Sequence, residues 1–384
     1  MKTLARPVLL FILSISISLA PCSCDILNPK NDATPLWKVQ IFSGALALLQ
    51  MNPHIWNGHT LFLGEKAGKT TLFLIENTTG KIKWEWNDFL ISKDEVSSDD
   101  EQYLFQNNFC FQTLVGVYLV DMNAGKTLRK TPLSQQGGGH SIQGLGSTFF
   151  NCVRGSVLNQ GNMYDGQFKE IFSLPQETDF RVSIRTPVPF IAPNQDTMLV
   201  LDIAKLRLRD VQLFSRLALY NLSKRAFVYD SARVMNESGP MPQINNDRIY
   251  QIQGASLVCN DLWTGREIWR REFGNSFLGY GFSIKDGKIF ATNGDSNLYC
   301  LDAETGRELW RKTRVAFDTP APFVMNSVVY VASGVLWAFD ANTGDELWKR
   351  TSQDDTGFRG RVNGADGKVY AYTRQNAYCY KAAR

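Results

Sequence analysis

The sequence contains few of the residues on which catalytic and metal sites usually depend. Its 384 residues include 3 histidines, and His54, His59 and His140 do not have the spacing of a zinc-binding helix. No Gly-x-Ser-x-Gly segment and no clear Cys/His pair supplies a nucleophile. We therefore expect no enzymatic activity, no metal and no cofactor.

A strong charge of one sign is absent as well. The chain has 41 Lys and Arg against 37 Asp and Glu, which gives a net charge of +4. A dedicated nucleic-acid-binding protein concentrates many more basic residues on one face, so this class is excluded. The acidic segment 94–101 lacks the glycine and alternating oxygen ligands of a calcium loop, and we expect a solvated surface there.

The glycine-rich segments do not have the pattern of a phosphate-binding loop. The glycines of residues 64–70 are too close together, and the segment lies between two expected strands instead of before a helix. A β-hairpin is the better interpretation. Residues 136–140, which include three consecutive glycines, are expected to form a flexible connection.

The one long apolar run, Val8 to Ala20, is too short to cross a membrane. Lys2 and Arg6 precede it, so residues 1–23 are predicted to be a signal peptide for export.

Two cysteines near the end of this run make it similar to a bacterial lipoprotein signal. We favour Cys24 as the lipidated residue because the small Ser23 precedes it, whereas Pro21 precedes Cys22. Residues 24–34 would then be a tether. The alternative is an ordinary secretory signal in which these cysteines have no role.

A short motif recurs along the C-terminal half of the chain. Residues 301–310 read as the end of a strand, a turn and a second strand, because an acid and a threonine hydrogen-bond the turn and a glycine adopts positive φ. The tryptophans of successive copies stand about forty residues apart, which is typical of a β-propeller. The acid, glycine and tryptophan of the three copies are Asp261, Gly265 and Trp269; Asp302, Gly306 and Trp310; and Asp340, Gly344 and Trp348.

Weaker copies extend the repeat towards the N-terminus. One retains Gly80 and Trp84, one near residue 125 retains the turn without the tryptophan, and two degenerate units lie near residues 166 and 221. The last unit stops before its tryptophan strand, and Trp37 has no strands before it, so the two ends are expected to share a blade. The prediction is an all-β, eight-bladed propeller over residues 35–384, with four-stranded antiparallel blades. We expect the tryptophans to pack between blades rather than to form a substrate surface.

The remaining cysteines are expected to be buried free thiols. Cys259, Cys300 and Cys379 occupy comparable positions in their repeats. Neighbouring sheets pack about 10 Å apart, whereas a disulfide needs Cα atoms within about 7 Å. The sequence leaves open whether Cys110 and Cys152 pair.

The segments between repeats are expected to meet on one face of the ring, because each leads from an outer strand to the next inner strand. They are rich in proline, glycine and charge, as at residues 181–187 and 237–242. A ligand or partner would contact several blades at once on this face.

The phrase Leu-Asp-x-x-Thr-Gly-x-x-x-Trp resembles the tryptophan-docking repeat of quinoprotein-like (PQQ-like) propellers. One branch of that superfamily consists of PQQ-dependent dehydrogenases, which usually have longer chains; the alcohol dehydrogenases among them also carry adjacent cysteines, which this sequence lacks. The other consists of BamB-type lipoproteins of the outer-membrane β-barrel assembly machinery. Length and leader make this chain similar to the second branch.

The resemblance also implies a binding site. BamB-type proteins contact periplasmic domains of the assembly barrel through an apolar-x-apolar-Arg segment and nearby acidic residues. Val182, Ile184 and Arg185 match the first element, with the two apolar side chains expected to be exposed anchors, and Glu237 is the nearest match to the second. Gly239 stands where a second acid is expected. Alternatively, Val182 and Ile184 belong to an ordinary strand end covered by an insertion at residues 190–215.

The resulting hypothesis is an exported lipoprotein scaffold in the cell envelope, lipid-anchored to the outer membrane of a Gram-negative bacterium, which contacts the membrane through its lipid alone. Its partners would be the periplasmic domains of a barrel-assembly factor. Two alternatives stay open: a periplasmic propeller enzyme that binds PQQ or another ligand, and a surface propeller that binds glycans or another protein.

Overall fold

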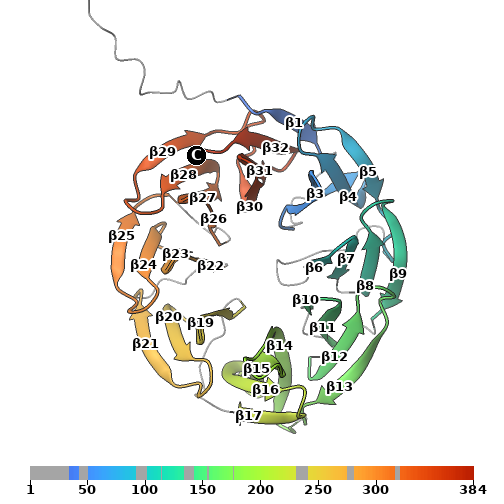
Figure 1. Cartoon of the computed structure of the whole chain (residues 1–384), viewed down its shortest axis with the longest axis vertical. Helices are drawn as coiled ribbons and strands as arrows, with labels where there is room; N and C mark the ends of the chain where they lie inside the picture. Colours follow the sequence, from blue (N-terminus) through green and yellow to red (C-terminus); the bar gives the residue numbers. More distant parts are fainter. Residues whose placement is uncertain are drawn as a thin grey trace, which may run out of the picture. The chain divides into compact units, whose positions relative to one another are not determined.

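The computed structural model describes residues 34–42, 51–91, 102–113, 115–133, 142–153, 155–175, 177–230, 241–274, 281–315 and 321–384. Within the unit Thr34–Arg384, the described strands form eight four-stranded antiparallel sheets, which follow one another around a ring (Figure 1). The predicted all-β, eight-bladed propeller is therefore confirmed. No helix in the described ranges is long and apolar enough to span a membrane.

In blades 1 to 7 the strands run in chain order from the ring centre outwards, and in blade 8 the N-terminal β1 is the outermost strand. Blades 1 to 4 are β2 (His54–Trp56), β3 (His59–Lys66), β4 (Lys69–Glu76) and β5 (Ile82–Trp86); β6 (Gln102–Phe105), β7 (Asn108–Gln112), β8 (Gly116–Asp121) and β9 (Lys126–Pro132); β10 (Ile142–Leu145), β11 (Thr148–Val153), β12 (Val157–Asn162) and β13 (Phe168–Ser173); and β14 (Phe180–Ile191), β15 (Thr197–Arg207), β16 (Gln212–Asn221) and β17 (Ala226–Asp230).

Blades 5 to 8 complete the ring. They are β18 (Gln243–Asn245), β19 (Arg248–Gln253), β20 (Ser256–Asp261) and β21 (Glu267–Glu272); β22 (Phe282–Lys285), β23 (Lys288–Thr292), β24 (Leu298–Asp302) and β25 (Glu308–Lys312); β26 (Phe323–Met325), β27 (Val328–Ser333), β28 (Val335–Asp340) and β29 (Glu346–Arg350); and β30 (Arg359–Ala365), β31 (Lys368–Tyr372), β32 (Asn376–Lys381) and β1 (Trp37–Gln40).

The two middle strands of a blade are buried on both faces because each blade packs between two neighbours. In β4, every residue from Thr70 to Ile75 is buried. Such strands read as continuous apolar runs instead of alternating patterns. Cys110, Cys152, Cys259, Cys300 and Cys379 lie on these strands as buried free thiols, and burial raises the pKa of each.

The ends of the described unit share blade 8, as predicted. Strand β1 pairs antiparallel with β32, with Trp37 opposite Cys379. The backbone amide of Leu36 extends this pairing by donating to the Cys379 carbonyl at 2.7 Å. An N-terminal strand thus completes a sheet whose other three strands are C-terminal, so blade 8 has no missing outer strand.

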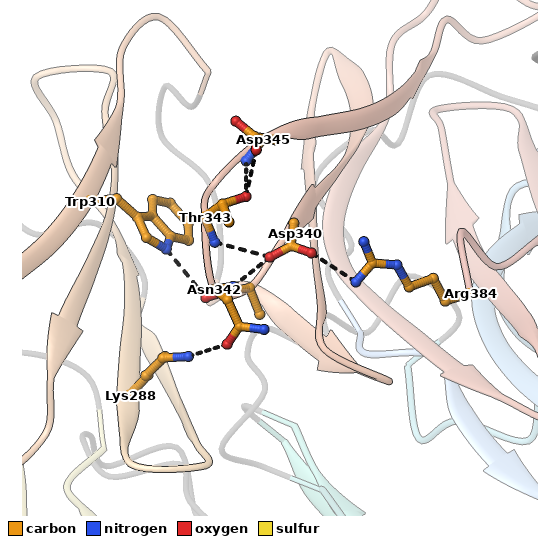
Figure 2. Close-up of polar contacts among 8 residues, drawn as sticks. Lys288, Trp310, Asp340, Asn342, Thr343, Asp345 and Arg384 are labelled. Carbon is orange, nitrogen blue, oxygen red and sulfur yellow. Dashed lines mark hydrogen bonds and ion pairs between the residues drawn. The ribbon is translucent and has the colours of Figure 1, made fainter. Parts of the chain in front are cut away.

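The repeated motif links neighbouring blades, as Figure 2 shows for blades 6 and 7. In blade 7, the Asp340 carboxylate accepts hydrogen bonds from the backbone amides of Asn342 and Thr343, at 2.8 and 3.0 Å. Trp310 of blade 6 points to this turn and donates from Nε1 to the Ala341 carbonyl at 3.2 Å. Gly344 has a φ of 74°, and a Cβ there would lie 2.8 Å from the Trp310 ring. The turn therefore needs glycine for its conformation and for its neighbour.

The same contact recurs elsewhere in the ring. The indole nitrogens of Trp37, Trp84 and Trp269 donate to turn carbonyls of the following blade, at 3.1, 2.8 and 3.3 Å. In blade 4, Tyr229 takes this role through its hydroxyl, which donates to the Leu262 carbonyl at 3.2 Å. The tryptophans thus hold adjacent blades together.

Candidate functional site

Blade 4 differs from the other blades in the length of its strands. In blade 4, the pairing of β15 with β16 begins with Met198 opposite Asn221. In blade 5, the pairing of β19 with β20 begins at the equivalent end with Arg248 opposite Asp261. From there β15 and β16 form ten pairs, whereas β19 and β20 form six, so blade 4 continues for four further pairs. At about 3.3 Å per residue, the hairpin extends about 13 Å farther.

The extension is three-stranded and lies on the face where the blade-to-blade connections run. Because successive strands are antiparallel, the turn between the second and third strands lies on the same face as the connection to the next blade. The first half of β14 pairs with the extension, with Phe180 opposite Arg207. Residues 190–215 thus belong to β14, β15, β16 and the turns between them, and the predicted insertion is corrected: its apolar residues form strands of the blade itself.

The expectation that Val182 and Ile184 are exposed anchors is also corrected. Val182 is 3% exposed and Ile184 is fully buried. Both belong to a core cluster that combines Leu201 and Ile203 of β15 with Phe150 of blade 3. The Ile184 amide also donates to the Gly155 carbonyl of blade 3 at 2.6 Å. These two residues fix the extension against its neighbour and do not face solvent.

Arg185 is the partly exposed member of the predicted segment, with 38% of its side chain accessible. Its Nη1 lies 3.8 Å from Oδ2 of Asp202, whose side chain is 11% accessible. Burial raises the pKa of the Asp202 carboxyl, and the charge of Arg185 opposes this rise. Removing Arg185 alone would leave a buried acid without its counter-charge.

The tip of the extension is a feature that our sequence analysis missed. Leu208 is 57% exposed and Val211 is 73% exposed, on either side of Arg209 and Asp210. The apolar-rich sequence from Met198 to Tyr220, interrupted at Arg209 and Asp210, is the signal that could have predicted a long hairpin with this turn.

Polar side chains on the innermost strands link neighbouring blades near the ring centre. Gln243 donates to the Phe282 carbonyl at 2.5 Å, Asn363 donates to the Pro53 carbonyl at 2.7 Å, and Ser283 donates to the Pro322 carbonyl. His54 hydrogen-bonds to Gln102 of blade 2. Burial lowers the pKa of His54, the hydrogen bond to Gln102 opposes this change, and the charge of Arg361 adds to it. Among the described residues, no three or more His, Cys, Asp or Glu side chains gather as a possible metal site.

Comparisons with known proteins agree with this architecture. A family model described as outer membrane protein assembly factor BamB matches residues 236–382. The solved structure of BamB from Moraxella catarrhalis superposes with a TM-score of 0.60 at 11% identity and covers 91% of this chain and 99% of that one. Residues 236–382 are thus similar to the BamB family, and the whole described unit has the eight-bladed propeller fold.

The likeness to BamB is not exclusive to that protein. A computationally designed protein, Ika8, superposes with a TM-score of 0.65 at 11% identity and covers 89% of this chain and 99% of its own. A europium-containing methanol dehydrogenase gives 0.61 at 12% identity, covering 88% of this chain and 84% of that one. At such identities these likenesses show the fold alone. No curated protein matches the sequence significantly.

Some residues of the expected BamB-like site lie outside the described part of the chain. Glu237, the proposed acidic element, falls in the segment 231–240, and Cys22 and Cys24 fall in residues 1–33. Of the predicted binding segment, the structure therefore places Val182, Ile184 and Arg185, and of these Arg185 is the one accessible to a partner.

Proposed function

We propose that the protein is an exported lipoprotein scaffold without catalytic activity, which binds a partner in outer-membrane β-barrel assembly. The observation that carries the proposal is the match of residues 236–382 to the BamB family model, within a chain that has the complete eight-bladed fold. Residues 1–23 would be removed and Cys24 would carry the lipid, or cleavage would instead precede Cys22 and lipidate that residue. Residues 24–34 would tether the propeller of residues 35–384 to the outer membrane.

The proposed binding surface is the face that carries the blade 4 extension, with periplasmic domains of the barrel-assembly factor as the partner. Arg185 supplies guanidinium donors for a partner carboxylate or carbonyl, and Glu237 supplies the complementary acid. Val182 and Ile184 contribute indirectly because their burial against blade 3 positions the strand that carries Arg185.

The ion pair of Arg185 determines how this proposal is tested. Arg185→Glu would place a second acid beside buried Asp202 and would disturb the fold. The double variant Arg185→Gln/Asp202→Asn removes both charges and keeps the side-chain sizes. We expect it to retain the wild-type Tm within about 3 °C and to co-purify less with the barrel-assembly factor.

The comparison variant is Arg311→Gln, which removes an exposed arginine of the outer strand β25. It should leave co-purification unchanged. If the Arg185→Gln/Asp202→Asn variant associates as strongly as the wild type, Arg185 is not part of the interface. If the wild type does not associate with the factor at all, the proposed function is wrong.

The likeness to methanol dehydrogenase favours a second candidate, a propeller enzyme with PQQ. The cofactor would bring quinone redox chemistry, and its carboxylates would need cationic partners. Arg359 and Arg361, on the innermost strand of blade 8, are the described residues of suitable charge. Adding PQQ and Ca²⁺ would then raise Tm and produce dye-linked alcohol oxidation. The scaffold proposal expects neither effect.

A further inference from the structure

The turn between β15 and β16 combines two features that are unfavourable for an isolated protein. Val211 has the largest exposed fraction, 73%, of the large hydrophobic side chains in the described ranges, and Leu208 beside it is 57% exposed. Val211 also has a φ of 58°. A β-branched side chain is strained in this left-handed region, where glycine or asparagine is usual. Neither the exposure nor the backbone conformation of Val211 stabilises the folded protein.

The turn is nevertheless held firmly by the strands beneath it. The Phe180 and Phe214 rings lie 6.2 Å apart, and the Arg207 guanidinium lies 4.9 Å from the Phe214 ring centre. Arg207 also pairs with Asp210 at 3.2 Å. The Leu208 amide donates to the Asp179 carbonyl at 2.9 Å. The two aliphatic side chains are thus presented on a pre-organised support, which lowers the entropic cost of binding.

The charges around the tip indicate the kind of surface it fits. The Arg209 side chain is 73% exposed, and its contact with Asp210, at 3.7 Å, is a solvent-exposed ion pair worth little. Arg209 is therefore available to a partner carboxylate. Arg207 and Arg209 balance Asp179 and Asp210, so the tip has no net positive charge to attract an anionic membrane surface. Two aliphatic side chains with balanced charges are a weak membrane anchor, whereas a protein pocket with an acidic rim satisfies both the apolar side chains and Arg209.

We propose that residues 208–211 form a knob that inserts Leu208 and Val211 into an apolar pocket with an acidic rim on the protein bound at this face. The proposal rests on the proposed scaffold function, because it assigns to the same partner a contact about 13 Å beyond the neighbouring hairpin. The contact adds an apolar anchor to the polar one at Arg185, as is typical of interface hot spots.

The test measures binding of the full mature protein to purified periplasmic domains of the barrel-assembly factor from the same organism. Val211→Gly removes the side chain and relieves the backbone strain, so we expect Tm to equal or exceed that of the wild type. The double variant Leu208→Ser/Val211→Gly should lose about tenfold or more in affinity. Arg209→Glu should weaken binding further and reduce its salt dependence.

Leu128→Ser is the matched control because Leu128 is 48% exposed on the outer strand β9 of blade 2. It should change affinity less than about twofold. If the wild type binds the factor and the tip variants bind equally well, the knob is wrong and the scaffold function stands. If the wild type does not bind, the proposed scaffold function is wrong, and so is the partner assigned to the knob. A loss of affinity accompanied by an equal loss of folded protein would also overturn the knob.

The alternative to a protein pocket is insertion of the knob into a membrane, and a fluorescent probe distinguishes the two. A bimane probe attached at Val211→Cys, in protein reconstituted with phosphatidylethanolamine and phosphatidylglycerol vesicles, would shift to the blue on entering lipid. We expect this shift only when the assembly factor is added. A shift with vesicles alone would overturn the protein pocket.

Discussion

Gly306 shows at the scale of one residue why the repeated motif is so regular. It has a φ of 72°, and a Cβ there would lie 2.6 Å from the ring of Trp269 in the preceding blade. Gly287 has a φ of 71° but no heavy atom within 4 Å of its would-be Cβ. The two glycines share a backbone conformation and differ in their neighbours.

This difference separates two energetic contributions. We expect Gly287→Ala to lower the free energy of unfolding by about 1 kcal/mol, from backbone strain alone. Gly306→Ala should cost about 2–4 kcal/mol, because the methyl group also overpacks the blade interface. Urea denaturation of both variants measures the difference. Equal losses would mean that the tryptophan contact does not constrain the glycine.

Sequence reasoning succeeded where one residue type is required at a fixed place. The acid, glycine and tryptophan of a turn are specified by local hydrogen bonds and one recurring contact, so they are visible in the three C-terminal copies. Val182 and Ile184 are different, because an apolar-x-apolar pattern fits an exposed anchor as well as a buried strand. Their burial depends on Phe150 in another blade, and this contact has no local signature in the sequence.

At the scale of elements, the connection between β29 and β30 shows how one carboxylate can hold a loop. Asp354 accepts hydrogen bonds from the Thr356 amide and hydroxyl, at 3.2 and 2.9 Å. It also accepts from the Thr373 hydroxyl at 2.5 Å and from Asn376 Nδ2 at 2.6 Å, both at the turn between β31 and β32. Burial disfavours the charged form, but these hydrogen bonds outweigh it and lower the pKa of Asp354 to about 2.

The lowered pKa predicts a pH-dependent contribution to stability. The contribution is complete above the ordinary aspartate pKa of about 3.9 and is lost as the pH falls towards 2. After allowance for solvent screening, Asp354→Asn should destabilise the protein by about 1–2 kcal/mol at pH 6. The difference from the wild type should shrink between about pH 4 and pH 2. Denaturant titrations across this range measure it.

Asp355→Asn is the control, since Asp355 is the exposed neighbour of Asp354 on the same connection. It should leave the free energy of unfolding within about 0.5 kcal/mol of the wild type at every pH. A constant difference between Asp354→Asn and the wild type from pH 6 to pH 2 would contradict the proposed origin of the effect.

The same scale shows where element prediction was incomplete. Blades 3 and 4 could be placed from strand alternation and turn residues, although their motifs are degenerate. The length of β15 and β16 could not, because residues 190–215 were interpreted as an insertion. The apolar residues on both sides of Arg209 and Asp210 in fact belong to one hairpin, whose strands are hard to recognise because middle strands read as continuous apolar runs.

For the whole molecule, ring closure depends on the pairing of β1 with β32, because β1 continues along the chain into blade 1 and is joined to the rest of blade 8 non-covalently. Trp37 on β1 is 7% exposed and donates to the Asn77 carbonyl of blade 1 at 3.1 Å. The Cβ that Gly80 lacks would lie 2.8 Å from the same side chain. Trp310 makes the equivalent contact between blades 6 and 7, but its strand is continuous with the chain on both sides.

We therefore expect the two tryptophans to differ in what their loss releases. Trp310→Ala should lower the free energy of unfolding by about 3–5 kcal/mol while the ring stays closed. Trp37→Ala should cost a similar amount and also loosen the four residues of β1, because it removes their tryptophan contact with blade 1 and leaves a non-covalent pairing with β32. Amides of β32 at the exposed edge would then exchange hydrogen by local opening, below the cost of global unfolding.

Hydrogen exchange with mass spectrometry tests this distinction. In Trp37→Ala, peptides covering residues 376–381 should lose protection before the rest of the ring, whereas in Trp310→Ala protection should fall evenly. Even loss of protection in both variants would mean that the shared blade is no weaker than the covalently continuous ones. Loss confined to β32 would identify ring closure as the step at which this propeller opens first, because β1 is joined to β32 by a non-covalent pairing and not by the chain.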